Sequence, residues 1–202
     1  MAKFEGLTII SDQVDTKELS VVLRELRNTL DMTVTGDVVE LGCYEGTTSL
    51  FLQRELVHRP KAAKSLWLYD SFEGLPEKSP EDSSPAGLQF IKGELLAKKQ
   101  NLVVNFKKAG LPLPRIKKAW FSELRNEDLP AKISFAFLDG DFYESIFDSL
   151  KLVWPKLSAG AVIIVDDYSN EALPGAAKAV NEWLNTHKAS IKVEQSLAII
   201  KL

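Results

Sequence analysis

The feature that most constrains the fold is a series of short apolar runs, each of which contains or precedes an acidic residue. The runs lie at 37–41, 65–69, 133–138 and 161–165. Their acidic residues are Glu40, Asp70, Asp139, Asp166 and Asp167. A short, nearly continuous apolar run is typical of a strand that is buried on both faces of a parallel sheet. The chain is therefore expected to contain a central parallel sheet.

Segments with helical spacing separate these runs. We predict helices over 16–30, 47–57, about 94–109, from about 146 to a stop at 158–160, and 175–187, with further strands at 116–120, 190–194 and 197–201. Alternating strands and helices predict an α/β fold with a Rossmann-like, doubly wound, mostly parallel sheet. The length of 202 residues fits one domain over 1–202. The polar, Gly- and Pro-rich stretch at 73–93 indicates a long loop, and we predict a lid insertion at about 73–100.

Composition excludes several classes of protein. The 25 basic and 28 acidic residues give a net charge of −3, which predicts no nucleic-acid partner. A single cysteine, Cys43, forbids an intrachain disulfide. The apolar stretches are too short to span a bilayer, and the first residues lack the apolar region of a signal peptide. The expectation is a cytoplasmic protein with no membrane partner.

The acidic residues at the strand ends predict a binding site. In a parallel sheet these ends lie along one edge, where doubly wound folds bind their ligands. A single carboxylate after a strand is often only a turn former, but four such ends are harder to explain in that way. Gathering them costs electrostatic repulsion, which a bound cation or a hydroxyl-rich ligand would offset.

The turn after the first apolar run is a candidate cofactor site. It contains two glycines, Gly42 and Gly46, with the bulky Tyr44 between them, so it lacks the Gly-x-Gly-x-x-Gly pattern that cradles a pyrophosphate. Such a turn suits S-adenosylmethionine, with Glu40 and the turn facing the methionyl end and Asp70 accepting bonds from the ribose hydroxyls. The alternative is an ordinary strand-to-helix turn without a ligand.

Asp139, Asp166 and Asp167 form a candidate metal site. Three carboxylates make an oxygen-only ligand set, which favours Mg²⁺ or Ca²⁺. The two histidines, His58 and His187, fall in predicted helices away from the strand ends. The alternative is that each aspartate caps a loop.

Three longer segments resemble the macrocin O-methyltransferase (TylF-like) family of class I S-adenosylmethionine-dependent methyltransferases. The segments are Asp70-Ser71-Phe72-Glu73-Gly74-Leu75-Pro76, Leu138-Asp139-Gly140-Asp141-Phe142-Tyr143-Glu144-Ser145, and Trp154-Pro155-Lys156-Leu157-Ser158-Ala159-Gly160 with Ile163-Ile164-Val165-Asp166-Asp167-Tyr168. Weaker similarity is found at 90–95 and 118–122. The resemblance extends over roughly 37–185, in matching order.

The resemblance implies an enzyme that transfers a methyl group from S-adenosylmethionine to a hydroxyl with Mg²⁺ assistance. It places the metal on Asp139, Asp166 and Asp167. It places cofactor contacts on the first turn, on the second strand end and near the adenine. The corresponding residues are Glu40, Gly42, Cys43, Tyr44, Gly46 and Thr47; Asp70, Ser71 and Phe72; and Trp120, Phe121 and Ser122.

Two departures from the family pattern limit what is carried over. The family's first turn usually has Arg-Gly-Gly, where this chain has Glu45-Gly46-Thr47. The chain is also short at its N-terminus, where sugar-modifying members have further helices, so a macrolide-sugar acceptor is not implied. A homodimer is suggested by family likeness alone.

The expected acceptor is a small polyhydroxylated molecule with vicinal hydroxyls, on a sugar or a catechol-like ring. Asp139 is the candidate catalytic residue, as a proton acceptor, and Asp141 is an alternative base that is also interpreted as a helix cap. Two other functions stay open: a methyltransferase that uses no metal, and a non-catalytic protein that binds S-adenosylmethionine.

Overall fold

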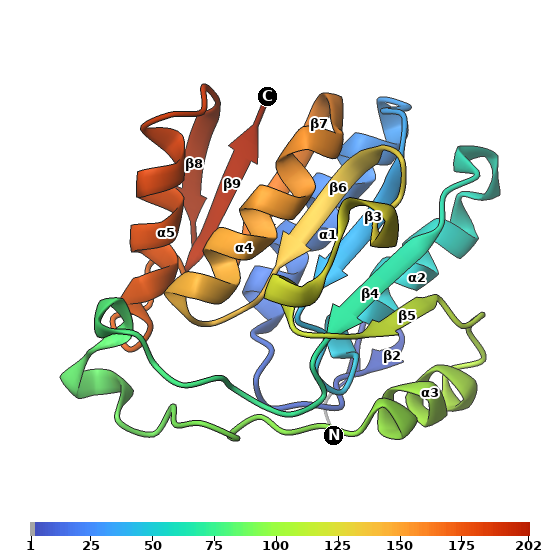
Figure 1. The fold of residues 1–202 in the computed structure, drawn as a ribbon. Helices are drawn as coiled ribbons and strands as arrows, with labels where there is room; N and C mark the ends of the chain where they lie inside the picture. Colours follow the sequence, from blue (N-terminus) through green and yellow to red (C-terminus); the bar gives the residue numbers. More distant parts are fainter. Residues whose placement is uncertain (1–2) are drawn as a thin grey trace.

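The computed structural model describes residues 3–202, which form a seven-stranded sheet covered by helices (Figure 1). The strands are β3 (Asp37–Leu41), β4 (Leu66–Asp70), β5 (Arg115–Lys118), β6 (Ile133–Leu138), β7 (Leu157–Val165), β8 (Ser190–Glu194) and β9 (Leu197–Lys201). Their order across the sheet is β5-β4-β3-β6-β7-β9-β8. The pairs from β5 to β7 are parallel and the pairs of β9 with β7 and β8 are antiparallel. The expected doubly wound, mostly parallel sheet is confirmed.

Helices cover both faces of the sheet. They are α1 (Thr16–Asp31), α2 (Thr47–His58), α3 (Lys99–Lys108), α4 (Tyr143–Val153) and α5 (Pro174–Leu184). Side chains of α1, α2 and α3 pack against one face, and side chains of α4 and α5 against the other. Within residues 3–202 no helix is long and apolar enough to cross a membrane.

Strand β6 shows why the sheet is buried on both faces. All six of its side chains are buried, and successive side chains point to opposite faces. Phe135 and Phe137 pack among the side chains of α1, α2 and α3, whereas Ala136 and Leu138 pack with those of α4 and α5. The continuous apolar run in the sequence follows from this double burial.

The boundary between α4 and β7 differs from the prediction. The apolar spacing predicts a helix that runs past Leu157 and stops at 158–160, but α4 ends at Val153 and a 3₁₀ turn follows over Trp154–Lys156. Pro155 has no N–H to donate, so the hydrogen bond that would continue the helix cannot form at this residue. Leu157 therefore begins the strand, opposite Ile133. Gly160 is not a helix cap: it lies inside β7 at φ +78°.

The helix predicted over about 94–109 is also shorter than expected. Leu95 has a left-handed backbone (φ 56°), which a helix cannot include, and α3 begins only at Lys99. The strand expected at 116–120 ends at Lys118, and the helix expected at 175–187 ends at Leu184.

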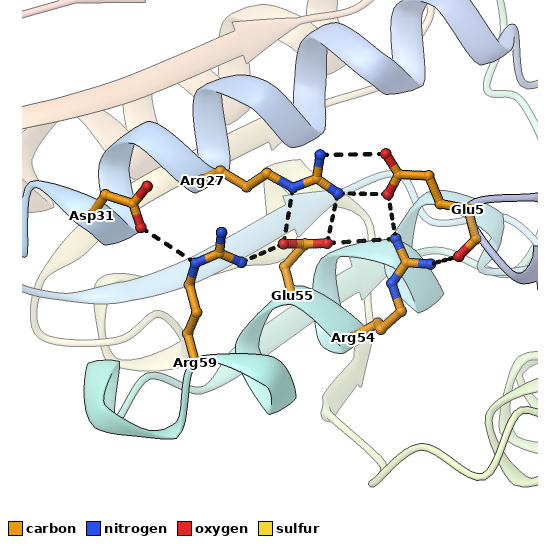
Figure 2. Close-up of polar contacts among 6 residues, drawn as sticks. All are labelled: Glu5, Arg27, Asp31, Arg54, Glu55 and Arg59. Atoms are coloured by element: carbon orange, nitrogen blue, oxygen red, sulfur yellow. Dashed lines mark hydrogen bonds and ion pairs between the residues drawn. The ribbon is translucent and has the colours of Figure 1, made fainter.

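An N-terminal hairpin that the sequence did not predict precedes α1. Its strands are β1 (Lys3–Phe4) and β2 (Leu7–Thr8). Figure 2 shows how the turn of this hairpin is fixed: the Glu5 carboxylate accepts hydrogen bonds from Arg27 of α1 and Arg54 of α2, at 2.5 and 2.7 Å. Both arginines also pair with the buried Glu55. Residues 9–15, here called the N-terminal strap, then lead from the hairpin to α1.

Candidate functional site

A cavity of about 350 Å³ lies at the carboxyl ends of β3, β4, β6 and β7. Its wall is formed by the N-terminal strap, the turn after β3, the segments after β4, β5, β6 and β7, and the first residue before α5. These residues are Asp12, Gln13, Asp15, Gly42, Tyr44, Asp70, Ser71, Gly74, Leu75, Pro76, Phe90, Leu95, Trp120, Phe121, Asp139, Gly140, Asp141, Ser145, Asp166, Asp167, Asn170 and Leu173. Of the five acidic residues that the sequence places at the strand ends, Asp70, Asp139, Asp166 and Asp167 line this cavity, and Glu40 is not among its described lining residues.

Asp70 fixes the turn after β3. One of its carboxylate oxygens accepts the backbone N–H groups of Cys43 and Tyr44, both at 2.9 Å, and the other accepts the N–H of Phe72 at 2.7 Å. These bonds hold two neighbouring loops against each other. Asp70 also lines the cavity, so it combines a place in the wall with a structural role that the sequence did not predict.

Glu40 lies beneath this turn. Its side chain is buried and accepts a hydrogen bond from the Ser49 hydroxyl at 2.5 Å. Burial, together with the negative charge of Asp70, raises the pKa of Glu40 to about 8. Glu40 is not among the described residues that line the cavity. The contact that the sequence predicts between Glu40 and the methionyl end of the cofactor therefore stays a prediction.

Three aspartates bring their side chains together in the cavity. One carboxylate oxygen from each of Asp139, Asp141 and Asp167 lies within 4.8 Å of the other two. Asp141 and Asp167 both have left-handed backbones, with φ of 59° and 58°. Asn170 holds Asp167 by donating its side-chain N–H to one carboxylate oxygen at 2.8 Å.

The set of converging residues differs from the expected one. Asp166 lines the cavity, but its carboxylate accepts the backbone N–H of Asp167 at 2.9 Å, and Asp141 joins the cluster instead. The interpretation of Asp141 as a helix cap is wrong, because the residue before α4 is Phe142 and no local side chain caps the helix.

The electrostatics of this cluster are unfavourable when all its members are ionised. Burial first, and then repulsion from neighbouring carboxylates, raises the pKa of Asp139 and Asp166 well above the ordinary value. The same two causes raise the pKa of Asp141 to about 8, and burial raises the pKa of Asp167. A hard divalent cation would relieve this repulsion, and the oxygen-only donor set is one that Mg²⁺ accepts.

The remaining residues predicted for the cofactor fall into two groups. Ser71, Trp120 and Phe121 line the cavity together with Gly42, Tyr44 and Asp70. Among the described residues, the following lie outside the wall: Cys43, Gly46, Thr47, Phe72 and Ser122. Cys43 is buried, and burial raises the pKa of its thiol well above the ordinary value.

The N-terminal strap contributes residues that the sequence reasoning missed. Asp12, Gln13 and Asp15 line the cavity. Asp15 also caps α1, accepting the N–H of Lys17 at 2.6 Å. The pattern Asp-Thr-x-x could have identified this cap, but a cap motif does not indicate which way a loop faces.

The segment between β4 and α3 is packed against the start of α5. Its Asp82 is 1% exposed and accepts the backbone N–H of Tyr143, the first residue of α4, at 2.7 Å. Ser84 donates to the carbonyl of Glu171, and Leu75 packs with Phe142 and Leu173. Figure 1 shows this segment, in green, crossing beneath the ends of the strands.

Comparison with solved structures identifies the class of fold. The O-methyltransferase NovP superposes with a TM-score of 0.78 at 24% identity, covering 92% of this chain and 79% of NovP. The calicheamicin methyltransferase CalS11 superposes with a TM-score of 0.76 at 17% identity, covering 92% and 78%. The chain therefore has the fold of a class I methyltransferase, as the resemblance implied.

The sequence comparisons identify the family. The model of the family macrocin-O-methyltransferase (TylF) matches residues 10–198, so the chain belongs to this family. The 8-demethyl-8-(2,3-dimethoxy-alpha-L-rhamnosyl)-tetracenomycin-C 4'-O-methyltransferase of Streptomyces olivaceus is 32% identical over 69% of this chain. The mycinamicin III 3''-O-methyltransferase of Micromonospora griseorubida is 25% identical over 92% of it. The chain spans 55% of the length of the first relative and 75% of the second.

Proposed function

We propose that this protein transfers a methyl group from S-adenosylmethionine to a hydroxyl of a sugar or similar polyhydroxylated group, with the assistance of Mg²⁺. The observation that carries the proposal is the convergence of Asp139, Asp141 and Asp167 in the same cavity as the turn after β3 and Asp70. Family membership and the relative that methylates a rhamnosyl-bearing tetracenomycin support it.

The proposed cofactor site extends from the turn after β3 to Trp120. Gly42 and Tyr44 of the turn line the cavity, as do Asp70 and Ser71, and the rings of Trp120 and Phe121 give an apolar surface suited to an adenine.

In the proposed metal site, Asp139, Asp141 and Asp167 supply the carboxylate oxygens. Asn170 orients Asp167 through its side-chain amide, and Asp166 orients the backbone of the same residue. When bound, Mg²⁺ would lower the cost of removing the proton from the acceptor hydroxyl. The candidate bases are Asp139 and Asp141. Because a cation lowers the pKa of a carboxylate that it binds, the base would be the one of the two that Mg²⁺ leaves free.

The reaction also requires that the acceptor and the cofactor are held in a fixed orientation, which the walls of the cavity would provide. Methyl transfer from a sulfonium is an in-line displacement, so holding the acceptor oxygen, the methyl carbon and the sulfur in line supplies much of the rate. Leu75, Phe90 and Leu95 of the segment after β4 close one side of the cavity and would keep water from the transfer.

Calorimetric titration of S-adenosylmethionine into the full chain with excess Mg²⁺ is the first test. We expect saturable binding, and a second assay for S-adenosylhomocysteine formation with methyl glycosides would then report turnover. Asp139→Ala should abolish turnover and leave cofactor affinity nearly unchanged.

Turnover that survives a strong chelator would favour the metal-independent methyltransferase. Binding without turnover of any acceptor would favour a non-catalytic binding protein, and no binding at two temperatures would contradict the cofactor assignment.

A further inference from the structure

The part of the chain that contains α3 and β5 is strongly basic. Residues 95–122 include seven lysines and arginines and no acidic residue, although the chain as a whole has a net charge of −3. Four of the seven cations are engaged within the protein. They are Lys99, Arg115, Lys117 and Lys118, which contact in turn the Ile116 carbonyl, the Trp67 ring and the carboxylates of Asp128 and Glu73.

The other three cations are free and lie at the two ends of α3. Lys98 directly precedes the helix, and Lys107 and Lys108 are in its last turn. All three side chains are exposed, and none of them forms an ion pair with another residue of the described chain, 3–202. The turn after β3 contacts α3 through a backbone group: the carbonyl of Glu45 accepts the side-chain amide of Asn105 at 3.0 Å.

The outer face of α3 combines lysines with an apolar side chain. Leu102 and Phe106 form the buried face of the helix. Val104 lies on the opposite side and is 45% exposed. Helical geometry places Lys107 and Lys108, three and four residues further on, on the same face as Val104.

Large apolar side chains are exposed more often here than elsewhere. Ten are exposed among the described residues, and half of them fall between positions 88 and 113: Leu88, Ile91, Leu96, Val104 and Leu113. Figure 1 shows that 88–98 and α3 run along one margin of the molecule, beyond the carboxyl ends of the strands. We call this surface the α3 margin; it comprises Leu88, Ile91, Leu96, Lys98, Val104, Lys107 and Lys108.

We infer that the α3 margin binds an anionic lipid surface. A protein that lies on a bilayer inserts exposed apolar side chains at the level of the headgroups, while its lysines attract the anionic lipids around them. The α3 margin offers both kinds of group, and its free lysines have no competing carboxylate partner in the described chain. The inference goes beyond the proposed function and does not depend on it.

The kinds of side chain on the α3 margin favour a lipid over other anionic partners. Its free cations are lysines and its exposed apolar side chains are aliphatic. Protein interfaces are enriched in arginine and aromatic residues and depleted in lysine, and proteins that bind single-stranded nucleic acid stack the bases on aromatic rings. The sequence expectation of no membrane partner rested on the lack of a spanning segment, which a surface contact does not require.

Binding at the α3 margin would hold the cavity beside the lipid. Phe90 and Leu95 belong to the same segment as Leu88, Ile91 and Leu96, and both line the cavity. The rest of the chain has an excess of acidic residues, which anionic lipids repel. Attraction at the α3 margin and repulsion elsewhere would give the bound protein one orientation.

Cosedimentation with vesicles tests the inference without cofactor or acceptor, so its result is independent of methyl transfer. The full chain is mixed at low salt with phosphatidylcholine vesicles that either contain or lack phosphatidylglycerol. We expect the partition coefficient to be at least about tenfold higher for the anionic vesicles and to fall as salt is added. Equal partition into the two kinds of vesicle, or no partition into either, would overturn the inference.

A pair of double variants locates the basic contact. Lys107→Gln combined with Lys108→Gln should lower partition into the anionic vesicles by about tenfold. Lys61→Gln combined with Lys132→Gln is the matched control, because it makes the same change in net charge at two exposed lysines that precede β4 and β6, at the opposite end of the sheet. Equal losses would mean that net charge and not the α3 margin controls binding, which contradicts the inference.

A second pair tests the apolar contact. Val104→Ser should lower partition by about threefold or more, because the valine is expected to leave water on binding. Val57→Ser is the control: Val57 is 43% exposed, close to the value for Val104, and lies near the end of α2, away from the α3 margin. Equal effects of the two substitutions would overturn the placement. Tighter binding to polyglutamate or to duplex DNA than to the vesicles would replace the lipid with an acidic protein or a nucleic acid.

Discussion

The backbones of Gly42 and Asp139 are in direct contact: a Cβ at position 42 would lie 1.7 Å from the Asp139 carbonyl oxygen. Asp139 in turn donates its N–H to the carbonyl of Leu41 at 2.8 Å. The turn proposed to bind the cofactor and the loop proposed to hold the metal are therefore one backbone unit, and a change in one must displace the other.

Gly42→Ala should disrupt both halves of the site. Residue 42 also has a φ of +90°, so the substitution adds backbone strain to the clash, and we expect a loss of about 3 kcal/mol or more in the free energy of unfolding. Gly110→Ala is the control, because Gly110 has a φ of +68° and a Cβ there would meet no atom within 4 Å, so this substitution should cost only about 1 kcal/mol. Chemical denaturation measures both, and equal losses would contradict the contact.

Asp82→Ala should release the segment after β4. The substitution leaves the N–H of Tyr143 without its acceptor and removes the partner of Ser79, so we expect a loss of about 2–3 kcal/mol in the free energy of unfolding. Limited proteolysis should then cleave within 77–90. Glu81→Ala removes only an exposed pair with Lys178 and should leave the melting temperature and the cleavage pattern nearly unchanged.

Gly175 lies against the Asp82 carboxylate, so its substitution gives a related prediction. A Cβ there would lie 1.8 Å from a carboxylate oxygen of Asp82, so Gly175→Ala should also loosen the segment. If this segment is the predicted lid, both variants should raise the Michaelis constant for the acceptor more than that for the cofactor. Equal changes in the two constants would indicate a general loss of structure.

Asp70→Asn should weaken cofactor binding through the turn after β3. The carboxylate accepts three backbone N–H groups, and an amide replaces one acceptor with a donor, at a cost of about 1–3 kcal/mol in stability. Asp37→Asn is a matched control, because Asp37 accepts the N–H groups of Ser65 and Trp67 at the opposite end of the sheet. Calorimetry with S-adenosylhomocysteine should show weaker binding for the first variant only.

The sheet and most of the acidic cluster were predictable because their signals are local. A run buried on both faces is apolar throughout, and the residue after it lies at the edge of the sheet whatever the rest of the chain does. The presence of Asp141 in this cluster was not predictable from a local signal. Its position depends on a left-handed φ and on a helix cap supplied by Asp82, which lies 61 residues away from Tyr143 along the chain.

The N-terminal strap and the start of β7 are two further features that the sequence patterns did not predict. Asp12 and Gln13 reach the cavity because Arg27 and Arg54 hold the preceding hairpin, a tertiary contact that no pattern in residues 3–15 encodes. The end of α4 was misplaced because apolar spacing continued through Leu157 while Pro155 ended the helix. Here the rule for proline should have outweighed periodicity.

The ion pairs drawn in Figure 2 predict an acid-sensitive contribution to stability. Burial alone would raise the pKa of Glu55, but its hydrogen bonds and charge interactions with Arg27 and Arg59 lower it to about 2. A carboxyl whose folded pKa is depressed stabilises the fold above its unfolded pKa, and this stability is lost as the pH falls towards the folded value. The contribution should be about 3 kcal/mol at pH 7 and should disappear between about pH 5 and pH 2.

Comparing the wild type with Glu55→Gln isolates this contribution from the other acidic groups. Their difference in unfolding free energy should be largest near pH 7 and should narrow steadily below pH 5. Glu77→Gln removes one side of an exposed pair with Lys92 and should give a small difference at every pH. Glutamine and protonated glutamate are both neutral, so a charge effect must fade as Glu55 becomes protonated. A difference in unfolding free energy that stays constant down to pH 2 would therefore show that Glu55→Gln destabilises the fold through packing and not through the lost charge.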